Sequence, residues 1–256
     1  MNRGFSFLKK IGHLVKTISI YQQMFKAFLS TILFIILTGT SFGQFGPRKL
    51  GIAVNAVYTT SAEIFLNPNA SNVEIRNKSF TLKNIWNPGL DLRYRLTKEF
   101  ILGLNVEYIK KTASANFDYI DSNKVVTLQP ETGFELVPFE LTAYYYFPFS
   151  TEDFKFLMGG GVGYYWGSFI RKFDVAEASV AKRKIAVGIQ VSASMDYMIR
   201  KNVSARFEMK FRDMQYNVRS RYVEYQDNIL NLPEGEFETK VDVNGLTFSL
   251  GMVVNL

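Results

Sequence analysis

The sequence has no cysteine, and its single histidine, His13, lies close to the start of the chain. Without cysteine there can be no disulfide, no thiolate ligand for zinc and no residue for attachment of an N-terminal lipid. Hydrolases of the Ser-His type need a histidine as general base, and none is present after His13. We therefore expect a protein that is not an enzyme, with no catalytic residue, no cofactor and no metal site.

A general excess of positive charge is also missing, although the formal net charge is +7. Residues 1–43 contain five basic residues and no acidic one, so the other residues carry 25 basic and 23 acidic side chains. The excess is local to the start of the chain. Nucleic-acid binding, which needs a basic surface, is therefore not expected.

No apolar run is long enough for a membrane-spanning helix. The run Ala27–Leu37 has about eleven residues, whereas a spanning helix needs roughly 20. Lys26 precedes this run and Ser41-Phe42-Gly43 follows it, which is typical of a secretory signal peptide. We assign residues 1–43 to a signal region and 44–256 to one mature domain. Residues 1–23, before Met24, are either an upstream start extension or a long first part of the signal.

Apolar residues alternate with small or polar ones in eight stretches of the mature domain, as in strands with one apolar face. The stretches are 50–58, 86–96, 100–108, 137–147, 154–166, 185–197, 203–211 and 245–256. Short connections at 97–99, 148–153 and 199–202 alternate with long polar ones at 59–85, 112–133, 169–183 and 217–242. This pattern predicts an all-β fold, an eight-stranded antiparallel up-and-down transmembrane β-barrel with short periplasmic turns and long extracellular loops. Pro138, which lacks a ladder donor, is expected near a strand end or at a bulge.

A soluble eight-stranded barrel with its apolar face inside is the alternative. The polar face mixes glycine with long charged residues, which suits the narrow interior of an eight-stranded barrel, whereas the apolar face is uniformly large. Aromatic residues also gather at both ends of the stretches, as at the two interfaces of a membrane. Both observations favour the membrane barrel and the outer membrane as its location.

Charged residues on the polar face should then fill the lumen. Five are basic and five acidic, and buried charges must be paired, so we expect a salt-bridged plug. The predicted lumen charges are Arg93, Arg95, Arg206, Lys210, Arg212, Asp91, Glu107, Glu140, Asp196 and Glu208.

Three stretches resemble small outer-membrane β-barrels of the OmpA/OmpX type and the related porin-family or PorT-like barrels: 134–141, 156–164 and the C-terminal strand. In such families the last strand carries a signal for the barrel-assembly machinery, which Ser249, Gly251, Val254 and Leu256 match here. The families usually end in an aromatic residue, and Leu256 departs from that.

The expected function is that of a non-enzymatic barrel that contributes to envelope integrity, or contacts an extracellular or envelope protein through its loops. The alternative is a small-solute channel or a secretion-associated, PorT-like component. Outer-membrane lipid and the assembly machinery are the other expected partners.

Overall fold

The computed structural model describes residues 49–114, 117–121, 124–173, 176–224 and 235–256. The predicted signal region, residues 1–43, lies outside these ranges. The one helix among the described residues is α2 (Val73–Asn77), and it is not long enough to cross a membrane. The strands are β1 (Leu50–Phe65), β2 (Ser79–Arg95), β3 (Phe100–Glu107), β4 (Ile109–Ser114), β5 (Phe117–Asp121), β6 (Lys124–Leu128), β7 (Glu131–Tyr146), β8 (Phe154–Lys172), β9 (Ala176–Arg183), β10 (Ala186–Arg200), β11 (Val203–Asp213), β12 (Gln215–Glu224), β13 (Phe237–Asp242) and β14 (Leu246–Asn255).

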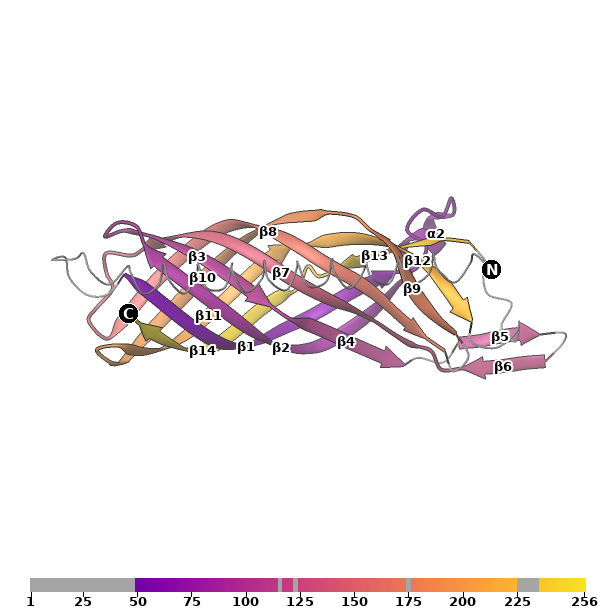
Figure 1. Ribbon diagram of the computed structural model, residues 1–256, viewed down its shortest axis with the longest axis horizontal. Coiled ribbons are helices and arrows are strands. Elements are labelled where there is room, and N and C mark those ends of the chain that lie inside the picture. Colours follow the sequence, from indigo (N-terminus) through magenta and orange to yellow (C-terminus); the bar gives the residue numbers. More distant parts are fainter. Residues whose placement is uncertain (1–48, 115–116, 122–123, 174–175, 225–234) are drawn as a thin grey trace, which may run out of the picture. The chain divides into compact units, whose positions relative to one another are not determined.

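The strands form a closed antiparallel barrel of eight staves, each made of one strand or of two strands in line (Figure 1). The single-strand staves are β1, β2, β7 and β8, and the double ones are β3 with β4, β10 with β9, β11 with β12, and β14 with β13. The last strand pairs with the first from Gly51↔Asn255 to Thr59↔Thr247, which closes the cylinder. The predicted eight-stranded up-and-down barrel is confirmed.

Short turns and the C-terminus lie at one end of the barrel, and α2 lies at the other (Figure 1). In barrels of this type the short turns are periplasmic and the opposite end is extracellular. Within the described residues, much of the long extracellular connections is strand. β1, β2 and β8 run on into them, and β4, β9, β12 and β13 continue the other staves. A separate hairpin, β5 with β6, forms within the second long connection.

The outer surface of the barrel carries a wide apolar belt, with side chains as exposed as Ile185 (79%) and Val187 (67%). Two sets of aromatic residues border it. The extracellular set is Tyr58, Trp86, Tyr108, Tyr164 and Trp166, and the periplasmic set is Tyr94, Phe100, Tyr145, Phe154 and Tyr197. An exposed apolar belt between two aromatic rims is the surface that a barrel presents to lipid. We call this part of the barrel the membrane level, and the part beyond the extracellular rim the outer level.

The inward side chains change character at the boundary between these levels. On β7, Glu140 and Thr142 point inward at the membrane level, whereas Phe134 and Leu136 point inward at the outer level. The apolar core of the outer level contains Ala62, Ile64, Leu82, Ile85, Ile109, Phe134, Leu136, Tyr165, Phe169, Ala186, Met214, Tyr216, Val218, Val241 and Val243. The outer level therefore has the interior of a water-soluble barrel.

β1 and β2 achieve this exchange by a backbone irregularity. In β1 the buried positions pass from Thr59 to Ala62, and in β2 from Leu82 to Ile85. Asn84, at this boundary, has a φ of 56°, in the left-handed region that asparagine tolerates better than most residues. The Tyr58 hydroxyl donates a hydrogen bond of 2.8 Å to the Asn84 side chain. The strand pair turns over here, so its alternating apolar face passes from the lipid to the interior.

In other staves the sequence pattern itself changes. Phe211 faces outward and Met214, three residues later, faces inward, although the strand keeps its orientation. Pro138 lies inside β7 and not near a strand end, which was one of the two positions expected for it. One side of Pro138 pairs with Tyr165 of β8, and the other faces the break between β3 and β4. Pro138 has no backbone N–H to donate to a neighbouring strand, and it lies beside the interruption between β3 and β4.

Candidate functional site

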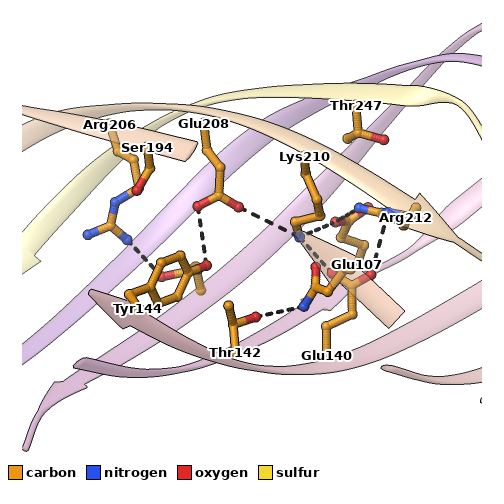
Figure 2. A network of polar contacts seen from close by, with 12 residues as sticks. Glu107, Glu140, Thr142, Tyr144, Ser194, Arg206, Glu208, Lys210, Arg212 and Thr247 are labelled. Atoms are coloured by element: carbon orange, nitrogen blue, oxygen red, sulfur yellow. Dashed lines mark hydrogen bonds and ion pairs between the residues drawn. The ribbon is translucent and has the colours of Figure 1, made fainter. Parts of the chain in front are cut away.

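The interior of the membrane level contains a continuous chain of charged side chains, part of which is drawn in Figure 2. The structure brings together nine of the ten predicted lumen residues, and none of these side chains is more than 10% exposed. They come from β2, β3, β7, β10 and β11. Alternate side chains of a strand point to the same side of the sheet, and these residues occupy the positions that point inward.

The periplasmic half of this chain joins β10, β11 and β2. Arg206 holds both carboxylate oxygens of Asp196, at 2.6 and 2.7 Å, and its third nitrogen is 2.7 Å from Asp91 Oδ1. Asp91 in turn contacts Arg93 Nε at 3.1 Å. Arg93 Nη2 then pairs with Glu208, so acidic and basic groups alternate along the series.

The extracellular half is centred on Lys210 and Arg212 of β11. Lys210 Nζ lies 2.6 Å from Glu140, 3.6 Å from Glu107 and 3.7 Å from Glu208, and the last contact joins the two halves. Arg212 Nη2 and Nη1 donate to the two oxygens of Glu107 at 2.7 and 3.2 Å. Its Nε also lies 3.4 Å from Glu140. Such bidentate, charge-assisted contacts are the strongest hydrogen bonds that side chains form.

Two buried tyrosines complete the network, and the sequence analysis did not select them. The Tyr144 hydroxyl accepts a 3.0 Å bond from Arg93 and donates a 3.2 Å bond to Glu208, while the Arg93 guanidinium lies 3.8 Å from the Tyr144 ring centre. The Tyr165 hydroxyl donates to Glu140 at 3.4 Å. Tyr144 lies four residues after Glu140 on β7, so alternation places both side chains on the inner face. That shared face could have identified Tyr144 from the sequence.

Glycine makes room for the Tyr144 ring. A Cβ at Gly103 or Gly159 would lie 2.6 Å from an atom of that ring. The nearly bare inner face of β8 therefore accommodates large side chains from the neighbouring strands, as an eight-stranded interior requires.

Arg95 is the predicted lumen residue that does not join the chain. It is the last residue of β2, half-buried at the periplasmic rim, and it makes no ion pair with the residues that the structure describes. Its guanidinium lies 5.4 Å from the centre of the Tyr146 ring. A rim position gives Arg95 access to water, so it needs no counter-ion.

Above the charged chain, the apolar core of the outer level fills the interior. Phe134, Leu136 and Phe169 are each at most 1% exposed, and Tyr165 belongs both to this core and to the charged network. Tyr222 and Phe237 are half-buried and stack with ring centres 4.6 Å apart.

The four residues of the predicted assembly signal all lie in or directly after β14. Val254 and Leu256 face the lipid, at 44% and 54% exposure, and Ser249 is half-buried. Gly251 is buried, and a Cβ there would overlap the Asn55 side chain. Close packing thus explains this glycine by itself, and the assembly role stays a prediction.

Chemically, this interior holds nearly balanced charges. Five carboxylates face four cationic groups, and each cationic group contacts at least two carboxylates. Across the described residues, no group of three or more His, Cys, Asp or Glu side chains is arranged to hold a metal ion. The arrangement is suited to bracing the barrel wall from within.

No protein-family model matches the sequence, and no curated protein matches it. Among solved structures, the outer membrane protein OprG from Pseudomonas aeruginosa is similar, with a TM-score of 0.58 and 16% identity over 83% of this chain and 98% of that one. Neisserial surface protein A matches with a TM-score of 0.45 and 13% identity over 83% and 100% of the two chains. Ail of Yersinia pestis matches with a TM-score of 0.43 and 9% identity over 82% and 100%.

The likeness to OprG shows the fold alone, and the structure itself supplies the apolar belt, the two aromatic rims and the closed wall. A helix-free wall of this kind can sit in hydrocarbon because every stave is paired on both sides. The chain has the fold of a small eight-stranded outer-membrane β-barrel.

Proposed function

We propose that this protein is a closed, non-enzymatic barrel that contributes to envelope integrity and presents its outer level to partners at the cell surface. One observation carries the proposal: the interior is filled at both levels. Nine buried charges occupy the membrane level, and a core of fifteen apolar residues occupies the outer level above them.

A water-filled path would have to pass both fillings. Opening the charged level would separate pairs such as Lys210–Glu140, at 2.6 Å, and leave unpaired charge in a buried place. Opening the outer level would expose Phe134 and Leu136 to water at the usual hydrophobic cost. The charged pairs of the membrane level and the apolar core of the outer level would each block a water-filled path. Together they support a barrel that does not conduct ions.

Planar-bilayer recording tests the proposal directly. We expect the refolded protein to insert without stable conductance steps, while an open porin in the same bilayer gives them. Steps in the nanosiemens range from the wild-type protein would contradict the closed barrel and favour the small-solute channel.

The secretion-associated, PorT-like alternative needs a cellular test, since a closed barrel could also serve in such an assembly. A deletion strain should secrete normally but show a more permeable envelope, measured by the entry of a large antibiotic. Loss of secretion with an intact permeability barrier would favour the alternative.

A further inference from the structure

A basic patch on the outer wall lies directly above the apolar belt. Its residues come from β9 and β12, which pair side by side, and from the short connection that follows β9. They are Lys182, Arg183, Lys184, Arg219 and Arg221, and all five are exposed. We infer that this patch binds the phosphate groups of anionic lipids in the outer leaflet.

The height of the patch is fixed by its neighbours. Lys184 is followed in the chain by Ile185, which belongs to the lipid-facing belt and is 79% exposed. The Arg183 guanidinium lies 5.5 Å from the ring centre of Trp166, a residue of the extracellular aromatic rim. Tryptophan rings sit at the headgroup level of a membrane. Arg183 and Lys184 therefore lie at the level of the lipid phosphates, and Lys182, Arg219 and Arg221 follow them outward along the paired strands.

Most of the patch charge is left uncompensated by the protein. Glu238 of β13 pairs with Lys184 at 2.7 Å and lies 3.6 Å from Arg219. Within the part of the chain that the structure describes, Lys182 and Arg221 form no ion pair. The nearest carboxylate on β11, Asp213, lies beside Ile189, at the top of the belt.

The opposite wall provides a contrast. Lys110 of β4 stands directly across from Glu135 of β7 in the strand register, so a carboxylate lies on the neighbouring strand of this wall. Lys83 of β2 is exposed and pairs across the strands with Ser61. Basic residues occur on both walls, but five gather on β9, β12 and the connection after β9. Clustered arginine and lysine near a membrane surface attract anionic headgroups, and the planar guanidinium matches phosphate geometry.

Retention of lipid A in nanodiscs of phosphatidylcholine tests the inference. The full mature chain is reconstituted with diphosphoryl lipid A, and bound lipid is measured by native mass spectrometry. The double variant Lys182→Ser/Arg221→Ser should retain lipid A about tenfold less tightly, because two unpaired charges leave the membrane surface. The matched control Lys83→Ser/Lys110→Ser should stay within about twofold of wild type. A heat-modifiable gel shift verifies that each variant is folded.

Two further arms identify the ligand. Fully dephosphorylated lipid A should bind wild type about as weakly as diphosphoryl lipid A binds the patch variant. Inorganic phosphate at the same phosphate concentration should not displace the lipid. Equal retention by both double variants, equal binding of dephosphorylated lipid A, or displacement by inorganic phosphate would each overturn the assignment. The outcome is independent of whether the barrel conducts.

Discussion

The two levels of this barrel bury opposite kinds of side chain behind opposite kinds of surface. At the membrane level, residues such as Phe139 and Leu141 of β7 face lipid, and Glu140 lies between them on the inside. At the outer level of the same strand, Phe134 and Leu136 lie inside, and Glu135 faces outward, half-exposed. The medium around the wall accounts for the difference. Lipid accepts apolar side chains and leaves the interior to polar pairs, whereas water drives the apolar side chains inward.

The difference teaches that the two interiors hold the barrel together by different means. The apolar core gains free energy from each side chain that it removes from water. The charged interior gains little from burial itself, and it depends on every member keeping its partners. Single changes should therefore act over the whole network at the membrane level and act locally at the outer level.

The largest effect is expected for Glu140→Ala. Glu140 is fully buried and contacts Lys210, Arg212 and Tyr165. Removing one partner of a buried ion pair costs about 3–5 kcal/mol of unfolding free energy. Urea unfolding followed by the fluorescence of Trp86 and Trp166 measures this cost.

The double variant Glu140→Met/Lys210→Met is the matched control for that experiment. It removes a positive and a negative charge together, so its cost should be smaller than that of Glu140→Ala alone. A double variant less stable than the single one would show that the pair itself, rather than an orphaned charge, carries the energy.

An effect of comparable size, but local, is expected for Phe134→Ala at the outer level. Phe134 is fully buried in the apolar core, and such truncations cost about 3–5 kcal/mol when they leave a cavity. The loss should increase protease cleavage of the extracellular side while the heat-modifiable gel shift of the barrel persists. Phe139→Ala, on the lipid face of the same strand at 41% exposure, should leave both readouts close to wild type. Equal behaviour of the two variants would break the distinction between the levels.

The smallest effect is expected for Glu238→Gln, outside the membrane level. Its carboxylate accepts a 2.7 Å bond from Lys184, and this hydrogen bond holds the pKa of Glu238 below its ordinary value. A surface pair of this kind contributes at most about 1 kcal/mol. With a depressed pKa, the contribution is present above the ordinary pKa and is lost as the pH falls through the folded value.

The urea midpoints of wild type and Glu238→Gln should accordingly differ slightly at neutral pH and converge in acid. A gap that widens on acidification would contradict this linkage. The contrast with Glu140 is direct, since both are carboxylates that bind a lysine, at 2.6 and 2.7 Å. Their surroundings, buried for one and partly solvated for the other, set the difference in cost.

Much of the membrane level could be predicted from the sequence. Strict alternation placed Glu140 and Arg212 on the inner face, and the equal count of charges suggested that they meet. Arg95 shows the limit: parity gives the side of the sheet, but not the height at which a residue sits in the barrel. Tyr144 was on the predicted inner face. Only the structure shows that its ring fits there, because Gly103 and Gly159 have no side chain to collide with it.

The outer level was missed for a physical reason. Its segments have few apolar residues, and these alternate with charged ones, so they resemble polar loops. Phe134 and Leu136 were seen as part of a family-like stretch and not as an inner face. Met214, three residues after Phe211, breaks the period of two at the place where the barrel leaves the membrane. A change of phase in the alternation was the available signal.

The sequence by itself determined the number of staves, their antiparallel order and the lipid face, because each follows from local alternation and the lengths of the turns. Only the tertiary structure decided which charges pair, since Arg93 and Glu208 are 115 residues apart in the chain. It also decided that the long connections become barrel wall, because strands such as β12 and β9 gain their backbone hydrogen bonds from each other. Local pattern sets which way a side chain points, and closure of the barrel sets what it meets.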